Sequence, residues 1–82
     1  MKHQRHFGTT ASREVVKTRN LVGDLNRIVQ IINEAISFEE KQAGVFDPLR
    51  VEYPMYAREL SARRDNLTDT IAALERSLDA AN

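Results

Sequence analysis

The chain has 82 residues, of which 41% are apolar, 29% charged and 6% aromatic. This length allows one small domain, and three glycines and two prolines are too few for a disordered linker or a sandwich of many short strands. Twelve basic and twelve acidic residues give no net charge, so no overall field attracts nucleic acid or an acidic membrane. The lack of cysteine excludes a disulfide framework and a thiolate zinc site.

No apolar run approaches the roughly 20 residues that a membrane-spanning helix needs, so membrane insertion is not expected. We expect a helical chain in the cytoplasm, where a protein without cysteine is compatible with reducing conditions.

Residues 1–11 lack apolar periodicity and are predicted to form a flexible N-terminal tail. Within it, His3 and His6 have the i, i+3 spacing that two metal ligands can use. The tail supplies no aspartate, glutamate or cysteine as a third ligand, so no metal site is predicted.

A helical hairpin is predicted over residues 12–82, with helices at 12–43 and 54–81 and a joint at 44–53. On both helices apolar residues recur at alternating spacings of three and four, which is typical of a coiled coil. We call these positions the core seam. It comprises Val15, Thr18, Val22, Leu25, Val29, Ile32 and Ile36 on the first helix, and Ala57, Leu60, Arg64, Leu67, Ile71, Leu74, Leu78 and Ala81 on the second. The expected fold is an all-α, antiparallel two-helix coiled-coil hairpin.

The joint contains the clustered helix breakers of the chain. Gly44 suits the left-handed position that follows a helix end. Asp47 and Pro48 indicate a turn, in which the aspartate bonds backbone amides. Pro54 fits the first turn of the second helix, where its missing N–H costs nothing.

The two halves of the core seam align in one antiparallel register, in which the numbers of facing residues sum to about 96. This register places Ile36 near Leu60 and Val29 near Leu67. It also brings Arg19 close to Glu75, an opposite-charge pair that supports it.

Two residues interrupt the pattern. The first helix either continues through Gly23, since the seam keeps its phase, or breaks there at a turn in which Asp24 caps a new helix. Arg64 lies on the seam opposite Ile32. Either its stem follows the apolar surface with the charge in water, or the charge faces a partner.

Apolar residues beside the seam widen the apolar face of the first helix beyond what the second helix can cover. They are Leu21, Ile28, Ile31, Ala35 and Phe38. We therefore predict a homodimer, in which the first helix packs against its copy in a four-helix bundle.

No phosphate-binding glycine loop, zinc-protease motif or nucleophile elbow occurs in the sequence. A two-helix hairpin has almost no interior in which polar groups could converge, so we predict no catalytic, cofactor-binding or metal-binding residue and no enzymatic activity. Arg58, Arg63 and Arg64 spread over more than one helix face beside acidic residues, so specific nucleic-acid binding is not favoured.

Residues 53–58 read Tyr-Pro-Met-Tyr-Ala-Arg, and residues 63–67 read Arg-Arg-Asp-Asn-Leu. With the acidic helix end, glycine and Asp-Pro turn at residues 39–48, they resemble FliJ-type flagellar export proteins of the alphaproteobacterial type, over residues 21–78. The resemblance implies a cytoplasmic coiled-coil hairpin of flagellar type III export that contacts the export ATPase, the gate and substrate chaperones and has no active site. Family members exceed 100 residues, so the chain resembles the hairpin-tip portion alone.

We therefore expect a non-enzymatic protein–protein interaction module, an adaptor similar to FliJ. Its predicted partner-binding residues are Tyr53, Pro54, Tyr56, Arg63, Arg64, Asp65, Asn66 and Leu67. The alternative is a small helical regulator or antitoxin-like protein that binds a partner helix or DNA.

Overall fold

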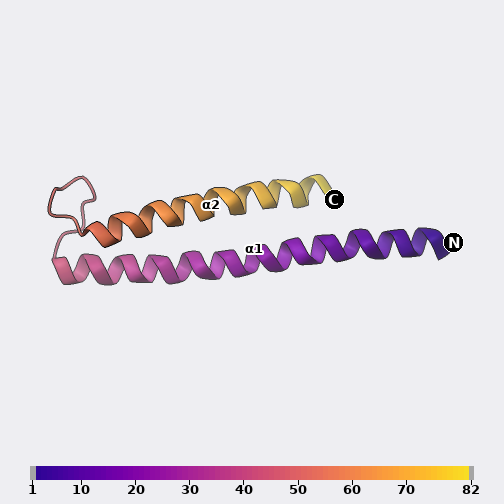
Figure 1. The fold of residues 1–82 in the computed structure, drawn as a ribbon, viewed down its shortest axis with the longest axis horizontal. Coiled ribbons are helices and arrows are strands. Elements are labelled where there is room, and N and C mark those ends of the chain that lie inside the picture. The colour runs from indigo at the N-terminus through magenta and orange to yellow at the C-terminus, as the bar shows by residue number, and fades with distance from the viewer. Residues whose placement is uncertain (1, 82) are drawn as a thin grey trace.

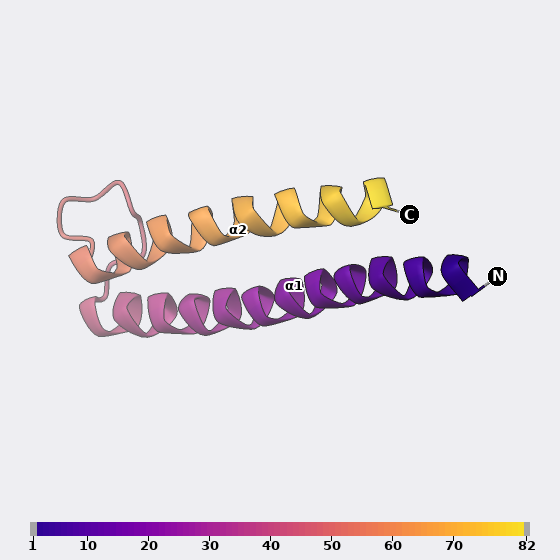
Figure 2. The same ribbon diagram turned by 45° about the vertical axis from the view of Figure 1, so that its right-hand side comes forward.

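The computed structural model describes the backbone of residues 2–81 and the side chains of residues 13–80. Two helices, α1 (Lys2–Ala43) and α2 (Met55–Ala81), are joined by a loop over residues 44–54. They lie antiparallel and side by side in a rod of 65 × 17 × 13 Å (Figures 1 and 2). The predicted all-α helical hairpin is confirmed.

The start of α1 differs from the predicted one. The helix begins at Lys2, whereas apolar periodicity predicted a start at Ser12 after a tail over residues 1–11. Periodicity detects a helix only where it has an apolar face to bury, and no proline prevents helix in the residues that precede Val15. The flexibility of these residues stays a prediction.

α1 passes through Gly23 without a break, which confirms the continuous helix. Asp24 does not cap a new helix but pairs along the surface of α1 with Arg27, at 2.6 Å between Oδ1 and Nη2. α1 ends where Gly44 adopts a φ of 70° and donates its N–H to the carbonyl of Glu40 at 2.8 Å. This is the left-handed cap that the sequence predicted.

The loop consists of two successive turns. Asp47 Oδ1 accepts the N–H of Leu49 at 3.0 Å, and the Asp47 carbonyl accepts the N–H of Arg50 at 3.1 Å. The Arg50 carbonyl then accepts the N–H of Tyr53 at 3.1 Å. Pro54 occupies the N-cap position of α2, where its carbonyl accepts the N–H of Arg58 at 3.1 Å. The sequence had predicted Pro54 within the first turn, and the helix instead begins one residue later, at Met55.

The core is concentrated near the loop. Ile32, Ile36, Tyr53, Ala57 and Leu60 form one buried cluster, which we call the core cluster. Farther along the rod, only Val22 and Ile71 are buried among the described side chains. Except for Tyr53, every one of these residues lies on the predicted core seam.

Cross-helix contacts near the loop agree with the predicted register. Ile36 and Leu60 share the core cluster, and Arg64 Nη1 donates to Asn33 Oδ1 at 3.1 Å. The side chain of Arg64 is one-third exposed, and its Nε lies 3.3 Å from Asp65. Its stem therefore follows the seam while its charge reaches polar groups at the rim. The pair expected between Arg19 and Glu75 is absent from the ion pairs of the described side chains.

Candidate functional site

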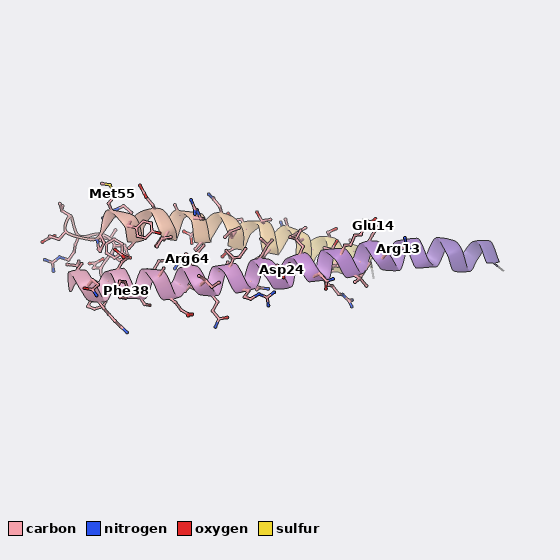
Figure 3. All side chains as sticks on the ribbon, turned by 60° about the horizontal axis from the view of Figure 1, so that its bottom comes forward. Arg13, Glu14, Asp24, Phe38, Met55 and Arg64 are labelled. Carbon is pink, nitrogen blue, oxygen red and sulfur yellow. The ribbon has the colours of Figure 1, made fainter. Side chains whose placement is uncertain are left out.

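The loop end of the hairpin exposes large apolar side chains. Leu49 and Val51 are 92% and 95% exposed, far more than apolar residues of a packed loop. They belong to a patch that we call the tip, formed by Phe46, Leu49, Val51, Met55 and Tyr56. Met55 marks this end of α2 in Figure 3. The molecule thus presents an apolar surface where its chain reverses direction.

Arg58 of α2 fixes the conformation of the tip. Its Nη1 donates to the carbonyl of Pro48 at 2.7 Å and its Nη2 to the carbonyl of Arg50 at 3.2 Å. The same guanidinium lies 5.3 Å from the centre of the Tyr53 ring, within the range of a cation–π contact. One side chain therefore ties both turns to α2 and holds the apolar residues outward.

Tyr53 lies inside the hairpin, where it joins the two helices. The residue is 4% exposed, and its hydroxyl donates to the carboxylate of Glu40 at 2.7 Å. Burial raises the pKa of Tyr53, and the negative charge of Glu40 raises it further. Tyr53 was predicted to bind a partner, but its buried ring is inaccessible to one. We therefore remove it from the candidate site and assign it to the core.

The remaining predicted partner-binding residues separate into two groups. Tyr56, Arg63, Asp65 and Asn66 are exposed, whereas Pro54, Arg64 and Leu67 are half-buried. Leu67 packs against the core cluster. Tyr56 and Arg63 stand seven positions apart and share one face of α2, while Asp65 lies about 200° around the helix from Arg63. The structure therefore places Tyr56 and Arg63, but not Asp65, on one side of the hairpin.

A second exposed apolar surface runs along α1. Leu21, Ile28, Ile31 and Phe38 are exposed, and Ala35 is half-buried because it also packs against the core cluster. We call these residues the α1 face; Phe38 marks its loop end in Figure 3. Each of Leu21, Ile28 and Ala35 precedes a seam position by one residue, so the α1 face lies about 100° around the helix from the core seam. Such exposed hydrophobic residues indicate a partner interface.

The charges around the tip balance one another. Arg50 Nη2 lies 3.0 Å from Glu52 Oε2, and this hydrogen bond lowers the pKa of Glu52. Both side chains are exposed, so the pair adds little to stability. The tip is therefore apolar without carrying a charge of one sign.

The described side chains form no group of three or more His, Cys, Asp or Glu that could hold a metal ion. His3 and His6 lie outside the side chains that the structure describes. A shallow depression beside Phe38 is lined by α1 residues alone: Gln30, Asn33, Glu34, Ser37, Phe38 and Lys41. In the described part of the chain, neither helix is long and apolar enough to cross a membrane.

The fold and these surfaces define a helical hairpin with two exposed apolar patches, one at its tip and one along α1. No protein-family model, curated protein or solved structure matches the chain.

Proposed function

We propose that this chain is a non-enzymatic protein–protein interaction module whose tip enters an apolar pocket of a partner protein. The observation that carries the proposal is the exposure of Leu49 and Val51 on a loop that Arg58 holds in place. A loop already fixed in one conformation loses little entropy on binding, which favours affinity. The balanced charges of the tip suit a protein pocket better than an anionic lipid surface, which attracts clustered lysine and arginine.

The resemblance to FliJ-type proteins supports a more specific role for the module. We propose an adaptor on the cytoplasmic side of flagellar type III export, with the export ATPase, the gate or a substrate chaperone as its partner. Tyr56 and Arg63 extend the contact from the tip along one face of α2, and Asn66 borders it, whereas Asp65 lies on another side of the helix. Pro54, Arg64 and Leu67 support this surface from within the hairpin.

The test is a binding titration of the purified chain against the export ATPase, the cytoplasmic domain of the gate and a substrate chaperone. We expect saturable binding to at least one, weakened at least about tenfold in the Leu49→Ser/Val51→Ser variant because two apolar anchors are lost. Ala62→Ser is the matched control, since Ala62 is exposed on α2 away from the core seam. Absence of binding to all three proteins contradicts the flagellar role. Binding that the double variant leaves unchanged contradicts the role of the tip.

The α1 face favours a second candidate function. A helical regulator or antitoxin-like protein binds a partner helix through such an apolar face, or it binds DNA. A gel-retardation assay with nonspecific duplex DNA at low salt distinguishes the two functions. We expect no retarded band, because the charges of the chain cancel. A band that disappears with added salt favours the regulator.

We further propose that the module is a homodimer, in which α1 packs against its copy in a four-helix bundle. The exposed α1 face supports this assembly, and two helices alone bury little apolar surface against the entropy of ordering the chain. Light scattering should give twice the monomer mass for the wild type and the monomer mass for Ile28→Glu. A wild type that is monomeric and folded at about 100 µM, well above a micromolar dissociation constant, contradicts the dimer.

A further inference from the structure

We infer that the α1 face pairs with the same face of a second copy in antiparallel orientation, about a two-fold axis midway along the face. This inference rests on the homodimer proposed above and adds its orientation and its contacts. The exposed residues of α1, their spacing and their charges carry it.

The spacing of the exposed residues is symmetric about the point between positions 29 and 30. Leu21 and Phe38 lie equally far from this point on opposite sides, and so do Ile28 and Ile31. All four are exposed in the hairpin. An antiparallel pair of α1 helices therefore places Leu21 against Phe38 of the second copy and Ile28 against Ile31 of the second copy. The resulting interface has four apolar layers, related in pairs by the two-fold axis.

Asp24 distinguishes the antiparallel orientation from the parallel one. It lies on the α1 face, one turn from Ile28, and pairs with Arg27 at 2.6 Å. In a parallel dimer, Asp24 would face Asp24 of the second copy, which places like charges inside an interface. The antiparallel dimer places it opposite the small side chain of Ala35 of the second copy. There the carboxylate of Asp24 keeps its ion pair with Arg27, and the small alanine side chain leaves room for water around it.

The charges beside the α1 face complement one another in the same orientation. Arg27 and Glu34 stand seven positions apart on one border of the face. The antiparallel pair brings Arg27 beside Glu34 of the second copy, and the two-fold axis repeats the pair. Opposite charges thus meet twice without any change in the hairpin.

The size of the face limits the affinity of the dimer. At about 1.5 Å per residue, the stretch from Leu21 to Phe38 is about 26 Å long, and a helix is about 10 Å wide. This footprint is smaller than the roughly 800 Å² per partner of a standard stable interface. We therefore expect a dimer that dissociates in the micromolar range, and its test requires protein at about 100 µM.

Disulfide crosslinking tests the orientation, because the chain has no cysteine of its own. The variants Leu21→Cys and Phe38→Cys are oxidised separately and as a mixture. We expect a crosslinked dimer in the mixture and little in either variant alone. Two copies of position 21 lie about 26 Å apart in the antiparallel dimer, far beyond the Cα separation of a disulfide. Efficient crosslinking of each variant with itself shows a parallel dimer and overturns the inference. The inference is also overturned if no crosslink forms at about 100 µM while circular dichroism shows folded helices.

Charge reversal tests the orientation without cysteine. Arg27→Glu and Glu34→Arg should each weaken the dimer about fivefold, because each creates two like-charge contacts between the copies. The double variant should recover part of the loss, since the reversed charge at position 27 still lies beside Asp24. Arg76→Glu is the control, since Arg76 is exposed on α2. A double variant as weak as the single ones overturns the inference. Leu49→Ser/Val51→Ser should dimerise normally, so a failure of the tip to bind a partner leaves this inference intact.

Discussion

Two glycines in similar surroundings have opposite consequences for stability. A Cβ atom built on Gly23 or on Gly44 meets no atom within 4 Å, so packing does not separate the two positions. They differ in the backbone. Gly23 lies inside α1, whereas Gly44 has a φ of 70°, a conformation that costs an L-residue energy.

We predict that Gly23→Ala raises the free energy of unfolding by about 1 kcal/mol, because alanine favours the helix and restricts the unfolded chain. Gly44→Ala should lower it by about 1 kcal/mol, because the left-handed cap becomes strained. Urea titrations of both variants measure the two changes, and each serves as the control for the other. A loss of stability in Gly23→Ala would contradict the continuous helix.

Tyr53 should make the hairpin sensitive to alkali. Its pKa is raised above the ordinary value of 10.0 by burial and by the carboxylate of Glu40. The folded chain therefore holds the phenolic proton more tightly than the unfolded chain does. The contribution of Tyr53 to stability is complete below pH 10 and is lost as the pH rises through the folded-state pKa.

The measurement uses Tyr56→Phe, which leaves Tyr53 as the single tyrosine of the chain. We expect its phenolate absorbance to appear at a higher pH in the folded protein than in urea. Glu40→Gln in the same background should lower the pKa of Tyr53, because the neighbouring negative charge is gone. Identical titrations of folded and unfolded protein would show that Tyr53 is not buried against Glu40.

At the scale of the elements, the core seam predicted which helix faces meet, because a heptad pattern is local and repeats many times. It missed the orientation of single side chains at the loop. Tyr53 suggested an interface residue, since tyrosine is enriched in interfaces. Its ring is instead buried in the core cluster, and its hydroxyl bonds Glu40, thirteen positions away. Spacing along one helix carries no information on such a contact.

Of the tip, the sequence predicted Tyr56 as a partner-binding residue but not the loop residues Leu49 and Val51. Leu49 and Val51 belong to a segment of turn residues, where apolar periodicity predicts neither burial nor exposure. Their outward position follows from the two turns and from the bonds of Arg58 to loop carbonyls. A sequence signal existed in the two apolar residues on either side of Arg50, within a segment too short to build a core.

Arg58 should control the order of the tip more than the stability of the helices. We predict that Arg58→Lys speeds hydrogen exchange at residues 49–53 about tenfold and leaves exchange in α1 and in the middle of α2 unchanged. A lysine ammonium cannot replace a planar guanidinium that bonds two carbonyls and covers an aromatic ring. Tenfold corresponds to about 1.4 kcal/mol, close to the lower end of what a hydrogen bond to a charged group contributes. Arg63→Lys is the control. Equal exchange in both variants would show that the turns hold without Arg58.

The register of the helices away from the loop has its own test. We predict that Val29→Cys/Leu67→Cys forms a disulfide within the monomer. The numbers of this pair sum to 96, as do those of Ile36 and Leu60, which lie together in the core cluster. Val29→Cys/Ile71→Cys, one turn out of register, is the control. Crosslinking of the control in place of the first pair would mean that the helices slide relative to each other.

At the scale of the whole molecule, the start of α1 and the end of α2 lie toward the same end of a rod 65 Å long, and the loop lies at the other (Figure 1). A mechanical force that pulls the start of α1 away from the end of α2 separates the helices one layer at a time. It does not load all the layers at once. Opening starts at the end where, among side chains 13–80, only Val22 and Ile71 are buried, and it reaches the core cluster last. In an optical trap, we expect gradual low-force unzipping that ends in one larger step. Leu60→Ala should shrink that step, and Ile71→Ala should leave it unchanged. Under tension, the helices would therefore separate first at the end of the rod opposite the loop, while the core cluster beside the tip stays folded.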